Sequence, residues 1–180
     1  MSDSAHPREP VINLSTWTID RVRSFAEDTD HLQELERIRE VTSAHARRST
    51  EPLQARLQWA MLSLQANERI YGNGPWERER RARNNFRLRT WVIDHLAPVT
   101  GDADWNPDSL AADTLAELSL RPAEARALAT QPHDLLPGQI DELRRHKNMT
   151  AHLATLIEHI QPGPVRDQLL HWEEVRQHLP

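Results

Sequence analysis

Arginines concentrate in one short segment, between Trp76 and Thr90, where only two glutamates offset them. Six arginines against two glutamates give this segment a net charge of +4: Arg78, Arg80, Arg81, Arg83, Arg87 and Arg89. On a helix, Arg80, Arg83 and Arg87 share one face. Guanidinium groups on a rigid face can each form paired hydrogen bonds with phosphate oxygens. The spacing therefore predicts an anion-binding surface, with nucleic acid as a candidate partner.

Amide and aromatic side chains accompany these arginines. Asn84 and Asn85 could contact bases or sugars, because an amide group both donates and accepts hydrogen bonds. Trp76 and Trp91 flank the segment, and single-stranded nucleic acids stack on aromatic rings placed among arginines. The predicted binding residues are Arg80, Arg83, Arg87, Asn84, Trp76 and Trp91.

An acidic segment offers a structural alternative for the same arginines. Residues 27–40 contain six acidic residues against two arginines, a net charge of −4. Two neighbouring helices of opposite charge would neutralise each other through surface ion pairs, each contributing about 0–1 kcal/mol. The sequence leaves open whether the arginine face binds a partner or pairs within the chain.

A second candidate site lies near the end of the chain. The segment from Arg166 to His171 matches the Arg-polar-x-x-x-His pattern and so resembles the motif of HEPN-type ribonucleases, which are small all-α proteins. The resemblance implies RNA cleavage without a metal, with His171 moving the proton and Arg166 holding the phosphate. The alternative is a histidine at the edge of the core, hydrogen-bonded to a neighbour.

Residues 118–153 resemble the DNA-binding domain of LuxR-type regulators in their opening Leu118-Ser119, the Ile140/Leu143 pair and a final His-Leu. A basic cluster lies where a groove-facing helix would be: Arg144, Arg145, His146 and Lys147. The glycine expected after the first helix is missing. Short helices joined by proline-containing turns also produce this pattern.

Metal ligands are not well placed in this sequence. Residues 102–113 have the oxygen spacing of a calcium loop, but Pro107 occupies the position that needs a glycine. Helix capping accounts better for these residues, with Asn106 as N-cap and Pro107 in the first turn. The ten histidines show no ligand spacing on one helical face. We expect neither a metal nor a cofactor.

The amino-acid composition excludes further classes of protein and of functional site. The chain has 180 residues, a net charge of −5 and a mean hydropathy of −0.72, which argues against a generally basic nucleic-acid coat. It has no cysteine, so disulfides, thiolate zinc sites and cysteine nucleophiles are excluded. Lys147 is the one lysine among 22 basic residues, which indicates a GC-rich bacterial genome. The six tryptophans are expected mostly in the core, with one or two at a ligand cavity or dimer interface.

Apolar residues recur with helical spacing from end to end, and strand signals are nearly absent. We predict an all-α fold: a helical bundle of longer N-terminal helices followed by a C-terminal array of shorter helices. Prolines at first-turn positions mark the helix starts. The predicted organisation is a flexible tail over 1–12, a helical bundle over 13–97 and a C-terminal helical region over 98–180 that packs with the bundle as one unit. Within the last region we expect helices near 107–118, 122–130, 137–147, 149–160 and 164–179.

The function predicted first is a non-enzymatic bacterial regulator or adaptor that binds another protein or nucleic acid, with a homodimer left open. The N-terminus lacks the features of a signal peptide, and no apolar run suits a membrane span, so we expect a cytoplasmic protein without membrane contact. The alternatives are the HEPN-like ribonuclease and a small helical enzyme or ligand-binding protein of secondary metabolism.

Overall fold

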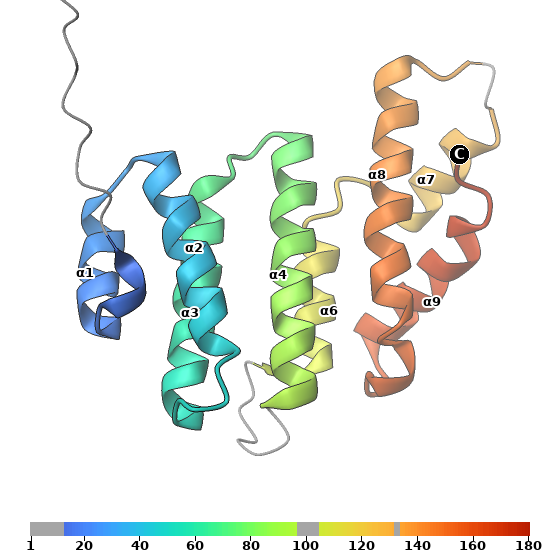
Figure 1. Ribbon diagram of the computed structural model, residues 1–180. Coiled ribbons are helices and arrows are strands. Elements are labelled where there is room, and N and C mark those ends of the chain that lie inside the picture. The colour runs from blue at the N-terminus through green and yellow to red at the C-terminus, as the bar shows by residue number, and fades with distance from the viewer. Residues whose placement is uncertain (1–12, 97–104, 132–133) are drawn as a thin grey trace, which may run out of the picture. The chain divides into compact units, whose positions relative to one another are not determined.

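The computed structural model describes residues 13–96, 105–131 and 134–180 (Figure 1). These residues form eight α-helices and two 3₁₀ turns, with no strand among them, which confirms the predicted all-α class. None of the helices described is both long enough and apolar enough to cross a membrane. The predicted tail over 1–12 lies outside the described residues.

The chain divides into two compact units, one up to Ala66 and one from Asn67 to Pro180. The helix α3 (Leu53–Ile70) contains the boundary between them. The predicted division at residues 97–98 falls on positions that the structure does not describe, and it stays a prediction.

The first unit contains a 3₁₀ turn (Leu14–Thr16), α1 (Ile19–Asp28), α2 (Leu32–Ala46) and most of α3. Its apolar side chains are buried at helical spacing, among them Val22 on α1 and Ile38 on α2, both with 0% exposure. The buried His45 ring stacks on Trp59, with ring centroids 4.5 Å apart. The Ser63 hydroxyl donates to the Arg39 carbonyl (3.1 Å) and so joins α3 to α2.

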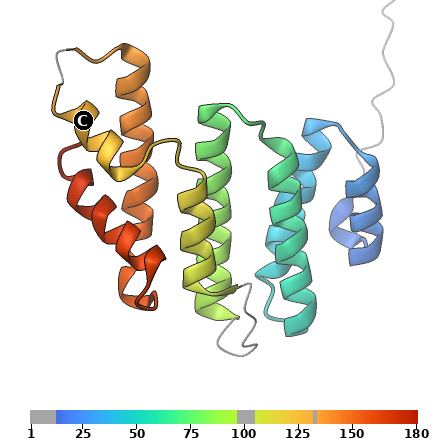
Figure 2. The ribbon, with the colours of Figure 1, turned by 180° about the vertical axis from the view of Figure 1, so that it is seen from behind.

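The second unit contains five helices, and a proline begins each of them, as first-turn prolines predict: α4 (Pro75–His95), α6 (Pro107–Ala116), α7 (Pro122–Ala129), α8 (Pro137–Ala154) and α9 (Pro164–Arg176). In both views α6 runs beside α4, and α9 packs against α8 and α7 (Figure 2). Their shared core includes Leu110, Leu143 and Trp172, which are nearly or completely inaccessible to solvent.

One predicted helix boundary is wrong. Residues 137–160 were expected to form two helices that meet near residue 148, but α8 continues from Pro137 to Ala154. No proline or glycine lies near Asn148 to break the helix. The Thr150 hydroxyl donates to the His146 carbonyl one turn earlier (2.7 Å), so this polar residue is satisfied within the helix. A short 3₁₀ turn (Ile157–His159) follows separately.

The start of α6 confirms the capping interpretation of the acidic loop. The Asn106 side chain accepts a hydrogen bond from the Ser109 backbone N–H (2.8 Å), and Pro107 is the first helical residue. Asp113 pairs with Arg89 from α4. Asp102 and Asp104 lie outside the described residues, where the calcium spacing cannot be followed.

The tryptophans divide by burial. Trp59, Trp105 and Trp172 are buried, as expected for core residues, while Trp17 and Trp91 are half-buried. Trp76 is 55% exposed at the start of α4.

Candidate functional site

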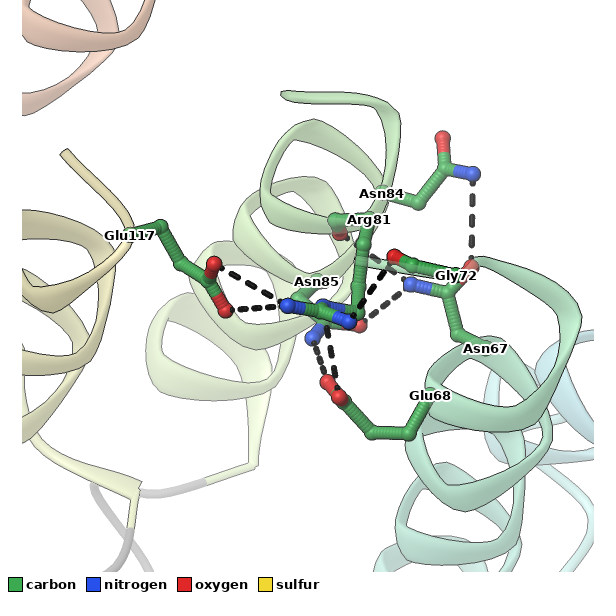
Figure 3. A network of polar contacts seen from close by, with 7 residues as sticks. All are labelled: Asn67, Glu68, Gly72, Arg81, Asn84, Asn85 and Glu117. Carbon is green, nitrogen blue, oxygen red and sulfur yellow. Dashed lines mark hydrogen bonds and ion pairs between the residues drawn. The ribbon is translucent and has the colours of Figure 1, made fainter. Parts of the chain in front are cut away.

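Five of the six arginines of α4 fall into two sets according to their partners. Arg78 belongs to neither set: it is half-buried, and its Nε has no hydrogen-bond partner in the described residues. Arg81 belongs to the first set: it is buried and donates two hydrogen bonds from Nη2 to the carboxylate of Glu117 (2.8 and 3.0 Å) (Figure 3). Its Nε lies 3.3 Å from Glu68 Oε2, an ion pair without hydrogen-bond geometry. Arg89 pairs with Asp113 and donates to the Ser109 hydroxyl (2.8 Å). These two arginines hold α4 to neighbouring segments.

Asparagines extend the contacts around Arg81 (Figure 3). The buried Asn67 amide donates to the Arg81 carbonyl (3.1 Å) and to Asn85 Oδ1 (2.6 Å), and Asn85 donates to Glu68 (2.7 Å). The Asn84 amide donates to the Tyr71 hydroxyl (3.2 Å). Asn84 thus has a partner within the protein, and its predicted contact with a ligand stays a prediction.

Arg80, Arg83 and Arg87 form the second set, here called the arginine face. All three are exposed, and within the described residues no hydrogen bond or ion pair holds any of them. The acidic residues 27–40 belong to the other unit, so the predicted pairing with that segment stays a prediction.

A groove of about 350 Å³ adjoins the arginine face, between α4, α6 and α8. Residues three and four apart lie on one side of a helix, which places five α4 side chains together along this groove. They come from α4 (Glu79, Ala82, Arg83, Phe86 and Arg87), from α6 (Thr114) and from α8 (Asn148, Met149, Ala151 and His152). The sequence predicted Arg83 and Arg87 as binding residues. It did not predict Glu79 or the contribution of α8.

Two rings and a carboxylate distinguish this groove. Phe86 stacks on His152, with ring centroids 5.5 Å apart and planes 30° apart. Partial desolvation of its ring, and then the charges of Arg87 and Arg83, lower the pKa of His152 below its usual value against the opposing charge of Glu79, which favours the neutral ring at pH 7. Glu79 is only 8% exposed, and its Oε2 has no hydrogen-bond partner in the part of the chain described.

The two tryptophans predicted to stack on bases have neighbours of their own. Arg145 lies over the Trp76 ring, 4.9 Å from its centroid. Trp91 stacks on His95, with centroids 4.9 Å apart and planes 13° apart. Neither tryptophan lines the groove. Their predicted contacts with a ligand stay predictions.

The side chains of the second basic cluster, residues 144–147, make contacts within the protein. Arg145 is buried and contacts the Trp76 ring, and the Lys147 ammonium donates to the Leu179 carbonyl (2.8 Å). Arg144 is exposed and lies 3.8 Å from Asp141. His146 Nε2 accepts a hydrogen bond from the Leu120 backbone N–H (3.0 Å). Three of these four side chains therefore contribute to packing, unlike the free basic face of a DNA-reading helix.

Acidic pH is expected to lower the melting temperature through His146. Burial lowers its pKa below the ordinary 6.5, against the opposing effect of Glu142. The unfolded chain therefore binds a proton near pH 6.5 before the folded protein does, so stability is lost as pH falls from 6.5 toward the folded pKa. His146→Gln retains an acceptor but does not titrate, so its melting temperature should fall less between about pH 7.5 and 5. Parallel melting curves for the two proteins would contradict this role.

Both residues of the ribonuclease motif lie on α9. Arg166 Nη1 donates to the Ile160 carbonyl (3.4 Å), and His171 is exposed on the same helix, α9. No hydrogen bond joins these two side chains in the described residues. Residues five apart diverge by about 140° around a helix, which accounts for their separation. The HEPN-like activity stays a prediction.

None of the comparisons with family models, with curated proteins and with solved structures finds a match for this chain. Among the described residues, no group of three or more histidine or acidic side chains is arranged to hold a metal ion. The binding properties of the groove and the arginine face therefore have to follow from their own side chains.

Proposed function

We propose that this protein binds nucleic acid through the arginine face, Arg80, Arg83 and Arg87, and acts by that binding rather than by catalysis. The proposal retains the expectation of a regulator or adaptor in a bacterial cytoplasm. Single-stranded nucleic acid is the form that the site suits best, because a groove with stacked rings adjoins the arginines.

The observation that carries this proposal is the division of the α4 arginines. Arg81 and Arg89 are held by carboxylates of the same unit, whereas the arginine face is exposed and without such partners in the described residues. Ion pairing within this unit therefore accounts for Arg81 and Arg89 but leaves the three cations of the arginine face available.

The spacing of the arginine face suits a chain of phosphates better than one small anion. A helix rises about 1.5 Å per residue, so Arg80 and Arg87 are separated by about 10 Å along α4. The three guanidiniums can therefore contact successive phosphates from a rigid element. The overall charge of −5 would oppose nonspecific coating, so binding has to depend on this local surface.

Changing Arg80, Arg83 and Arg87 together to alanine is expected to weaken binding of a labelled single-stranded oligonucleotide by on the order of tenfold or more. Each phosphate contact contributes about 0.7 to the slope of log affinity against log salt, so the slope should become shallower by about 2. Fluorescence anisotropy over a salt series measures both quantities. The melting temperature should be unchanged, because the three side chains are exposed.

A charge-matched control separates this site from general electrostatics. Arg121, Arg126 and Arg144 are also exposed in the second unit, and their joint change to alanine removes the same charge. This control should leave the salt slope nearly unchanged. Equal losses in the two triple variants, or no binding by the unaltered protein, would refute the proposal.

A further inference from the structure

The groove beside the arginine face contains an acceptor that phosphate binding does not require. Glu79 is 92% buried on α4, and its Oε2 has no hydrogen-bond partner in the described residues. Buried polar atoms in folded proteins nearly always have partners, and Glu79 is one of the residues that line the groove, so its unpaired oxygen is an acceptor for a ligand that donates to it. A phosphate cannot do so, because it would bring a second negative charge.

The other lining residues indicate what kind of ligand carries that donor. Phe86 and His152 form a stacked pair in the groove wall, and Met149 adds apolar surface beside them. A flat ring suits such a wall. Arg83 and Arg87 line the same groove and remain exposed, so an anionic group joined to the ring could lie against them. The three features together describe a flat ring with a hydrogen-bond donor and an attached phosphate.

Nucleobases differ in how well they suit a carboxylate. Guanine has an N–H and an adjacent amino group on one edge, so it can donate two parallel hydrogen bonds to the two oxygens of Glu79. Cytosine and adenine have one amino group each. Thymine and uracil present a single ring N–H between two carbonyl oxygens, which a carboxylate would repel. The buried acceptor therefore discriminates among bases.

We propose that the groove between α4, α6 and α8 binds one nucleotide with an amino-bearing base, guanine best, with the base edge on Glu79 and the phosphate on Arg83 and Arg87. The volume of about 350 Å³ is near the lower end of ligand sites, which suits one nucleotide rather than several. This inference rests on the proposed function and gives that binding surface a base preference.

The test compares two single-stranded DNA 10-mers, oligothymidine and the same strand with one central guanine. The unaltered protein should bind the guanine strand on the order of tenfold more tightly, the size of effect that a bidentate base contact produces. In Glu79→Gln the preference should fall to about twofold or less, because the amide presents a donor as well as an acceptor. Arg83→Ala/Arg87→Ala should instead weaken binding of both strands by similar factors.

One further variant is a control for Glu79→Gln, and a second tests the ring in the groove wall. Glu77→Gln removes an exposed carboxylate two residues away on the same helix and should retain the full guanine preference. His152→Ala changes an exposed ring of the groove wall and should weaken binding of the guanine strand more than of oligothymidine. The melting temperature of Glu79→Gln should be no lower than that of the unaltered protein, because the change removes an unpaired buried charge.

The outcomes separate this inference from the proposed function. Equal affinity of the unaltered protein for the two strands overturns the base preference and leaves nucleic-acid binding intact. Binding of neither strand refutes the proposed function. Free deoxyguanosine monophosphate that binds as tightly as the guanine strand, and more tightly than thymidine monophosphate, supports the nucleotide site and makes a free nucleotide its ligand.

Discussion

Arg81→Leu is expected to lower the free energy of unfolding by about 3 kcal/mol or more, because it removes one partner of a buried ion pair. Arg81 is 8% exposed and holds both carboxylate oxygens of Glu117, whose side chain is 26% exposed. The variant leaves that carboxylate without its cation and deprives the Gly72 carbonyl of a donor. Urea unfolding at neutral pH, followed by circular dichroism, measures the change.

Arg80→Leu is the matched control, since Arg80 is adjacent on α4 but exposed. It should change the free energy of unfolding by about 0.5 kcal/mol or less. Arg81→Leu/Glu117→Leu should recover much of the loss, because two apolar side chains leave no unpaired charge. Similar destabilisation by Arg81→Leu and Arg80→Leu would show that the ion pair contributes little.

The contrast between these neighbouring arginines shows why sequence alone could not define the site. Arg80 and Arg81 are the same residue type in the same stretch of sequence. Helical periodicity can only tell which arginines share a helix face. The acidic partner of Arg81 is Glu117, 36 positions later, and that of Arg89 is Asp113. Which arginines remain exposed therefore depends on how α6 packs against α4. The spacing of residues within α4 does not predict that packing.

More of the all-α fold than of the candidate site could be predicted, because the sequence signals for helices are local. Helical periodicity and a first-turn proline are properties of a few neighbouring residues, and five helices of the second unit begin at such prolines. The same local signals failed near Asn148, where two helices were predicted to meet. Core packing of Leu143, Met149 and Leu153 keeps α8 continuous through that stretch.

Glu79 shows why the groove could not be predicted from the sequence. In the sequence it only offsets the charge of the arginine segment, although its spacing from Arg83 and Phe86 places all three on one side of a helix. That spacing could have indicated a mixed surface of acid, arginine and ring. The groove itself depends on Asn148, Met149 and His152 of α8, more than sixty positions away, and no local pattern connects them to α4.

Trp172→Ala is expected to lower the free energy of unfolding by about 3–5 kcal/mol, the range for removing a large aromatic side chain from a core. Trp172 has 0% exposure at the centre of the second unit and lies against His146, with ring centroids 5.5 Å apart. The truncation would leave a cavity that the surrounding helices cannot fill. Guanidinium unfolding of the full chain measures the loss.

Trp172→Phe tests a separate property of the same side chain. The Trp172 Nε1 is buried and has no hydrogen-bond acceptor in the described residues, so the native protein carries the cost of an unpaired donor, about 1–3 kcal/mol. Phenylalanine loses part of the ring but also removes that donor, and the two effects oppose each other. We therefore expect Trp172→Phe to cost about 1 kcal/mol or less. A cost close to that of Trp172→Ala would mean that the indole N–H has a partner in solution, such as an ordered water, and that its hydrogen bond contributes to stability.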